Sequence, residues 1–124
     1  MSSMTLSEML ERARSELDRL APSDLSDAVS RGAIVVDVRD SAQRSAQGGL
    51  PGAHFIDLTV LEWRLAPSSP SRSMDIWPDQ EVILMCRQGY SSSLAAARLQ
   101  ELGLTGATDL IGGYEAWMAH VEGR

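Results

Sequence analysis

The chain has 124 residues, enough for one domain of common size and too few for two. Its hydrophobic content of 44% and charged content of 23% are those of an ordinary globular protein. A formal net charge of -6, with no basic run, argues against a nucleic-acid or membrane partner, although a local field can still attract a small anion. The single cysteine excludes an internal disulfide, and with only two histidines besides we expect no metal site and no cofactor.

The N-terminal segment predicts an amphipathic helix. Its apolar residues recur at spacings of three and four and are Leu6, Leu10, Ala13, Leu17 and Leu20. Pro22 is expected to stop this helix. Charged residues interrupt every apolar run here, so we expect no secretion signal, and a lone thiol suits a cytoplasmic location. We therefore divide the chain into a helix over residues 1–21, packed on the domain or docking a partner, and a domain over residues 22–124.

The domain begins with a short helix and an apolar strand. The helix is expected to be capped by Ser23 and to end at Gly32. The residues expected to face the core are Leu25, Ala28 and Val29. Residues 33–38 are mostly apolar and β-branched, which is typical of a strand buried on both faces of a parallel sheet.

Two capping boxes are predicted in the middle of the chain. Asp40 with Gln43 predicts the start of one short helix. Thr59 with Glu62 predicts the start of another. The other features expected here are a turn at residues 48–53, a strand at residues 54–58, inward-facing Leu61 and Leu65, and a long Ser/Pro-rich loop at residues 66–80.

The last third of the chain contains two more pairs of a strand and a helix. Residues 82–86 predict a buried strand that ends in Cys86, and residues 91–102 predict the helix after it. Residues 107–111 predict another strand, followed by a helix at residues 114–120. Because apolar strands alternate with helices, we predict an α/β fold with a small, mostly parallel sheet flanked by helices on both faces.

The loop after Cys86 predicts a nucleophile. In an open α/β sheet, ligands bind beyond the carboxyl ends of the strands, where Cys86 lies. A helix start capped by Ser91 or Ser92 directs free N–H groups and partial positive charge at the loop. Gly89 permits backbone angles that gather several N–H groups, and Arg87 adds a full charge. We therefore predict a thiol pKa below that of a free cysteine; the alternative is an inert, buried cysteine.

Three stretches of the sequence match motifs that occur together in one family. The first, "VVDVRDSAQRSAQGGLPGA", carries Asp37 and Arg39 and ends in a Pro-Gly-Ala turn. The second, "CRQGYSSSLAAARLQELG", is similar to a Cys-x-x-Gly active-site loop with its helix, and the third, "DLIGGYEAW", to a Gly-Gly-x-x-x-Trp motif. With the order of the elements, they resemble the single-domain rhodanese-like sulfurtransferases from about residue 22 to the end.

The resemblance implies a rhodanese-like fold and an enzyme that moves sulfur. Cys86 would take a sulfane sulfur from a small anionic donor such as thiosulfate, hold it as a persulfide, and pass it to cyanide or a thiol. By match, the donor would be cradled by Arg87, Gln88, Gly89, Tyr90, Ser91 and Ser92. Many family loops carry an arginine where this chain has Ser91, so anion binding would depend more on Arg87. Some members lack the cysteine and only bind partners, so a non-enzymatic module is the alternative.

Four further residues are candidates for supporting this site. Asp37 and Arg39 share a strand face and either shape the edge of the active site or form a structural ion pair. Trp63 and Arg64 either line the mouth of the pocket or have ordinary core and surface roles. Phosphatases of the same fold need Cys-x5-Arg, and because Ser92 stands at the arginine position we do not expect phosphatase chemistry.

Overall fold

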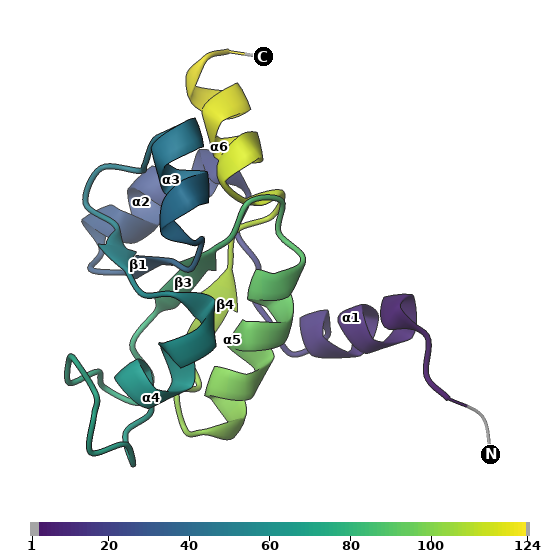
Figure 1. The fold of residues 1–124 in the computed structure, drawn as a ribbon, viewed down its shortest axis with the longest axis vertical. Helices are drawn as coiled ribbons and strands as arrows, with labels where there is room; N and C mark the ends of the chain where they lie inside the picture. Colours follow the sequence, from purple (N-terminus) through teal and green to yellow (C-terminus); the bar gives the residue numbers. More distant parts are fainter. Residues whose placement is uncertain (1–2, 124) are drawn as a thin grey trace.

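The structure, a computed structural model, describes residues 3–123 and shows an α/β domain (Figure 1). Four parallel strands form one sheet in the order β2-β1-β3-β4. The strands are β1 (Ile34–Asp37), β2 (His54–Phe55), β3 (Val82–Met85) and β4 (Ala107–Asp109). The helices are α1 (Leu6–Arg14), α2 (Leu25–Ser30), α3 (Ser41–Gln47), α4 (Leu61–Leu65), α5 (Ser91–Glu101) and α6 (Gly113–Val121), with 3-10 turns η1 (Pro22–Asp24) and η2 (Leu58–Val60).

The central strands bury side chains on both faces of the sheet. Alternate residues of β3 enter two different cores, because successive side chains of a strand point to opposite faces. The core under α4 and α5 includes Leu61, Leu65, Val82, Leu84 and Leu99. The core under α2 and α6 includes Leu25, Ala28, Ile83, Met85 and Tyr114. The predicted parallel sheet with helices on both faces is therefore confirmed. Within residues 3–123, no helix combines the length and the apolar character needed to cross a membrane.

The N-terminal helix is shorter than its apolar pattern predicted. α1 ends at Arg14, and Leu17 and Leu20 are buried beyond it. The N–H of Leu20 donates to the Asp109 carbonyl at 3.1 Å, and its carbonyl accepts from the Ile111 N–H at 2.8 Å. Leu20 thus pairs with the end of β4 like a short parallel strand. A helical Leu20 could not make these bonds, so the second half of the predicted helix was wrong.

One of the two predicted capping boxes is confirmed. Asp40 accepts the Gln43 N–H at 2.8 Å, and the Gln43 side chain accepts the Asp40 N–H at 3.4 Å. The second box was wrong, because the capping residue is Asp57, which accepts both the N–H and the hydroxyl of Thr59. Glu62 instead forms a salt bridge with α5.

Three smaller predictions were also wrong. Ser23 lies inside η1, and Asp24 occupies the N-cap position of α2. Val29 is exposed, because only the side of this short helix that carries Leu25 and Ala28 packs against the core. All four strands are shorter than expected: β1 spans Ile34–Asp37, β2 ends at Phe55, β3 at Met85 and β4 at Asp109.

Candidate active site

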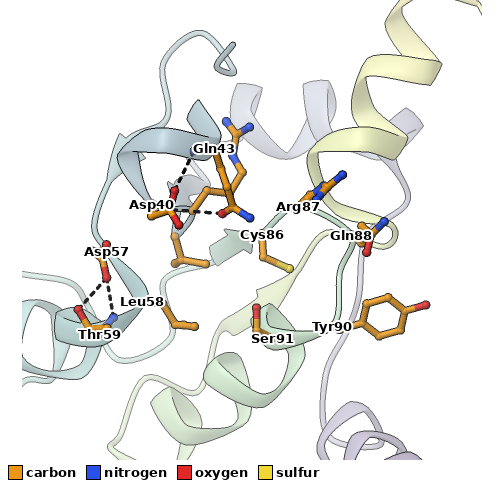
Figure 2. A pocket seen from close by; sticks show the side chains of 12 residues that line it. Asp40, Gln43, Asp57, Leu58, Thr59, Cys86, Arg87, Gln88, Tyr90 and Ser91 are labelled. Carbon is orange, nitrogen blue, oxygen red and sulfur yellow. Dashed lines mark hydrogen bonds between the residues drawn. The ribbon is translucent and has the colours of Figure 1, made fainter. Parts of the chain in front are cut away.

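A pocket of about 570 Å³ opens at the carboxyl edge of the sheet, with Cys86 in its wall (Figure 2). Its lining comes from the segments that follow β1, β2 and β3. These segments contribute Val38, Arg39, Asp40 and Gln43, then Asp57, Leu58 and Thr59, and then Cys86, Arg87, Gln88, Tyr90 and Ser91. This is the edge where open α/β sheets bind ligands. Cys86 is itself only 6% exposed, so an incoming group must enter the pocket to reach the sulfur.

The sulfur of Cys86 has two hydrogen-bond partners in its own loop. The Gly89 N–H donates to Sγ at 3.1 Å, and the thiol donates to the Ser92 hydroxyl oxygen at 3.1 Å. Burial raises the pKa of the Cys86 thiol, but its hydrogen bonding with Ser92, Ser91 and Gly89 lowers it. The net result is a pKa below the ordinary value, in the direction expected for an activated thiol.

Behind the sulfur lies a buried hydrogen-bond network centred on Asp109. Asp109 accepts the hydroxyls of Ser92 at 2.7 Å and Ser93 at 2.8 Å, and it pairs with the Arg19 Nε at 2.7 Å. When the thiol ionises, the Ser92 hydroxyl can turn to the sulfur, because Asp109 keeps its bonds to Arg19 and Ser93. Sequence reasoning missed Asp109, whose only signal was a carboxylate inside the strand-like run "ATDLI".

The serines at the start of α5 do not act as the expected caps within the described chain. Tyr90 occupies the N-cap position, with its ring exposed, and Ser92 bonds to Cys86 and Asp109 instead. The Ser91 hydroxyl lies beside the pocket and helps to lower the pKa of Cys86. The serines therefore act on the thiol rather than on the end of the helix.

Glycines let the Cys86 loop lie directly against the start of α6. Gly89 has a φ of +86°, and a Cβ there would lie 2.7 Å from the backbone nitrogen of Gly112. Gly113 has a φ of +63°, and a Cβ there would collide with the carbonyl oxygen of Cys86. This closeness lets the Tyr114 N–H donate to the same Cys86 oxygen at 2.8 Å. The Gly-Gly motif thus brings the start of α6 within hydrogen-bonding distance of Cys86, the residue that follows β3.

The side chains of Arg87 and Gln88 are held by a partner outside the pocket. Arg87 Nε donates to Glu115 Oε2 at 2.6 Å, and Gln88 Nε2 donates to Glu115 Oε1 at 3.3 Å. The bonds to Arg87 and Gln88 hold the pKa of Glu115 below its usual value. Figure 2 shows Arg87 directed away from the Cys86 sulfur. This corrects the expectation that Arg87 gives the loop a free positive charge.

Of the four residues predicted to support the site, one pair lies at the pocket wall and the other pair lies outside the pocket. Asp37 and Arg39 form a fully buried ion pair at 2.7 Å, with the guanidinium 3.9 Å from the centre of the Tyr114 ring. Arg39 also borders the pocket, so the pair anchors one wall while acting as a structural ion pair. Trp63 and Arg64 lie outside this pocket: the Trp63 side chain is exposed, and Arg64 bonds to the 66–80 loop.

The charged groups of the pocket wall do not favour a dianion. Both lining arginines are paired with carboxylates, Arg39 with Asp37 and Arg87 with Glu115. Two further carboxylates line the wall, those of Asp40 and Asp57. The wall therefore offers an anion the backbone N–H groups at the start of α5 rather than a free guanidinium.

Known proteins of similar sequence and fold identify the family of this chain. The rhodanese-like domain family matches residues 21–120. A thiosulfate sulfurtransferase GlpE of Ectopseudomonas mendocina is 34% identical over 105 residues, 85% of this chain and 88% of the relative. The structure of the human single-domain sulfurtransferase TSTD1 superposes with a TM-score of 0.69 at 26% identity, covering 81% of this chain and 94% of that one.

A third relative shares almost the whole length of the chain. The protein RPA3614 of Rhodopseudomonas palustris, of unknown function and described as a possible tyrosine phosphatase, superposes with a TM-score of 0.83 at 26% identity. It covers 98% of this chain, and 94% of its own length is matched. The family match over residues 21–120 and the 34% identical GlpE relative show that the chain belongs to the rhodanese-like domain family. With its cysteine in place and relatives that are named sulfurtransferases, it is a sulfurtransferase in the general sense.

Proposed function

We propose that this protein carries a sulfane sulfur on Cys86, taking it from thiosulfate or a similar small donor and passing it to cyanide or a thiol. The observation that carries the proposal is the setting of Cys86. Its sulfur lies in the pocket wall, accepts the Gly89 N–H and bonds to Ser92, and its pKa is lowered. A thiolate held in this way is a nucleophile at neutral pH. The names of the GlpE relatives support the choice of donor.

The first step loads the cysteine. The Cys86 thiolate attacks the outer sulfur of thiosulfate, a new S–S bond forms, and the S–S bond of the donor breaks. Its electron pair leaves with sulfite. Backbone N–H groups at the start of α5 would stabilise the negative charge on the persulfide and on the leaving group.

The second step unloads it. A nucleophilic acceptor attacks the terminal sulfur of the persulfide, and the electron pair of the broken S–S bond returns to Cys86. Cyanide leaves as thiocyanate, and a thiolate leaves as a persulfide. The cycle needs no general base once the thiol is ionised, which fits a pocket built around the sulfur rather than around a histidine. A thiol that must stay reduced fits a reducing compartment, and we place the protein in the cytoplasm.

A phosphatase function, named as a possibility for RPA3614, has less support in this chain. Phosphoryl transfer by a Cys-x5-Arg loop needs the arginine to hold the phosphate oxygens bidentately. Here the corresponding residue is Ser92, whose hydroxyl is committed to Cys86 and Asp109.

Intact-protein mass spectrometry tests the proposal. Incubation with thiosulfate, mercaptopyruvate or a low-molecular-weight persulfide should add one sulfur atom, and cyanide should remove it with release of thiocyanate. The matched control, Cys86→Ser, should never gain the sulfur. If the folded protein gains no sulfur from any of the three donors, the sulfur-carrier proposal fails and a partner-binding module becomes the better reading.

A further inference from the structure

The N-terminal helix lies beside α5 and reaches the active-site loop through the side chain of Arg14. Within Leu6–Arg14 no side chain is buried, and Leu6 is 74% exposed. At its end, however, Arg14 Nη2 donates to the Gly89 carbonyl at 2.7 Å, and Arg14 Nε donates to the Ser93 hydroxyl at 3.0 Å. The helix is therefore attached at the place where the Cys86 loop turns into α5.

A second arginine of the same segment reaches the same carbonyl. Arg19 Nη2 donates to the Gly89 oxygen at 3.2 Å, while its Nε pairs with Asp109 at 2.7 Å. Two guanidinium groups thus converge on one backbone oxygen of the loop, although the first twenty residues lie outside the region matched by the family. Charged donors make hydrogen bonds roughly twice as strong as neutral ones, so this carbonyl is held firmly.

Both groups that hydrogen-bond to the sulfur in this loop are linked to these arginines, Gly89 directly through its carbonyl and Ser92 through Asp109. Gly89 donates its N–H to Cys86 Sγ, and its carbonyl is the oxygen that Arg14 and Arg19 hold. Ser92 bonds to the sulfur, and its hydroxyl is oriented by Asp109, which Arg19 pairs with. The segment therefore restrains both contacts of the thiol from behind the loop.

The same bonds also orient the next peptide. In a trans peptide the C=O and the N–H point in opposite directions. With the Gly89 carbonyl held toward Arg14 and Arg19, the N–H of Tyr90 is directed to the other side of the loop, away from the arginines. Tyr90 is a lining residue of the pocket, so we expect this N–H to face the space that would receive a persulfide.

We propose that Arg14 and Arg19 are positioning residues for sulfur transfer, and that the N-terminal segment is a working part of the active site. They touch no reacting atom but fix the Gly89 and Ser92 groups that hold the sulfur. The effect of these two arginines on the rate of sulfur transfer rests on the proposed sulfurtransferase function. The full-length match to RPA3614 is consistent with a segment that belongs to the domain.

The test compares two arginines of α1 in the full chain. Arg14→Gln removes the charged fork but leaves Asp109 paired with Arg19 and Ser93, so the variant should fold. Arg12→Gln is the matched control, because Arg12 lies on the same helix and is exposed. The pH dependence of Cys86 alkylation by iodoacetamide is measured in the parent and both variants. This readout requires no sulfur transfer, so it separates the present proposal from the proposed function.

In Arg14→Gln we expect the apparent pKa of Cys86 to rise by about half a unit, which lowers alkylation below the pKa about threefold. Loading by thiosulfate should slow by a similar factor, and Arg12→Gln should match the parent in both measurements. Arg14→Lys should fall between parent and Arg14→Gln, because one ammonium cannot reproduce the two-pronged contact.

Thermal unfolding separates positioning from simple support. If Arg14→Gln lowers the melting temperature but leaves the alkylation pKa and the loading rate of the folded protein unchanged, the arginine is structural and the proposal is overturned. Equal alkylation profiles for Arg14→Gln and Arg12→Gln overturn it as well. If the alkylation pKa of Cys86 rises in Arg14→Gln but the parent accepts no sulfur from any donor, the proposed function fails while the positioning of the thiol stands.

Discussion

The outer and inner sides of the Cys86 loop are built differently. On the outer side Arg87 pairs with Glu115, and both side chains are about half exposed. On the inner side Asp109 is fully buried and is bonded to Arg19 and two serines. Exposed ion pairs are screened by solvent and contribute little to stability. Breaking a buried pair leaves a charged group or a hydrogen-bond donor with neither a partner nor solvent. Arg87, which follows Cys86 in the sequence, is thus held less firmly than Arg19 and Asp109, which are far from Cys86 in the sequence.

The most damaging change on the inner side should be Asp109→Ala. It leaves the Arg19 guanidinium and the Ser92 and Ser93 hydroxyls without their buried acceptor. We expect the free energy of unfolding to fall by about 3–5 kcal/mol. Urea denaturation measures this as a lower midpoint at an unchanged slope.

The matched control for this comparison is Glu115→Ala on the outer side. Because the Glu115 side chain is about half exposed and its salt bridge to Arg87 faces solvent, its removal should leave the urea midpoint close to that of the parent. Equal losses in the two variants would show that the two sides of the loop are not energetically distinct.

Gly113→Ala should produce the next largest effect. The added methyl group meets the backbone of Cys86 and Arg87, and the φ of +63° is itself unfavourable for alanine. We expect a loss of about 1–3 kcal/mol in the free energy of unfolding, together with slower alkylation of Cys86. Gly103→Ala is the control for backbone strain alone, because its φ is +105° and the described chain leaves open space around it. A loss no greater than that of Gly103→Ala would mean that the loop gives way easily.

These comparisons also show what the sequence could predict. The strand that ends just before Cys86 and the helix after the loop were predictable, because apolar periodicity and a glycine loop are local signals. The bond from Arg14 to Gly89 was not, because it joins residues 75 positions apart and only the fold brings them together. The sequence indicated that Arg87 would bind the anion, because it does not show that Glu115, 28 positions away, lies beside Arg87 in the fold. Local chemistry predicted the nucleophile, and tertiary contacts decide which charges serve it.

The lowered pKa of Cys86 predicts a modest pH dependence of stability. Because the pKa is lower in the folded protein, the unfolded chain binds more protons in the window between the folded and the unfolded pKa. Stability from this group therefore rises with pH across that window, is fully present above the unfolded pKa, and is lost as the pH falls through the folded pKa. Urea midpoints of the parent and Cys86→Ser, compared across neutral and alkaline pH, measure the difference. A difference that stays constant or reverses with pH would contradict a thiolate-stabilising loop.

The smallest effect is expected on the outer side, from Arg87→Ala. Since the Arg87 guanidinium is tied to Glu115 and directed away from the sulfur, its loss should change the KM for thiosulfate by less than about twofold. Ser91→Arg provides the contrast, because it adds a cation beside the pocket at a position bordered by the sulfur and by Tyr90. That variant should lower the KM about tenfold through a charge-assisted contact with the dianion. If Arg87→Ala instead raised the KM as much as Ser91→Arg lowers it, Arg87 would have to leave Glu115 when the donor binds. The outer side would then be a mobile anion clamp rather than a surface ion pair.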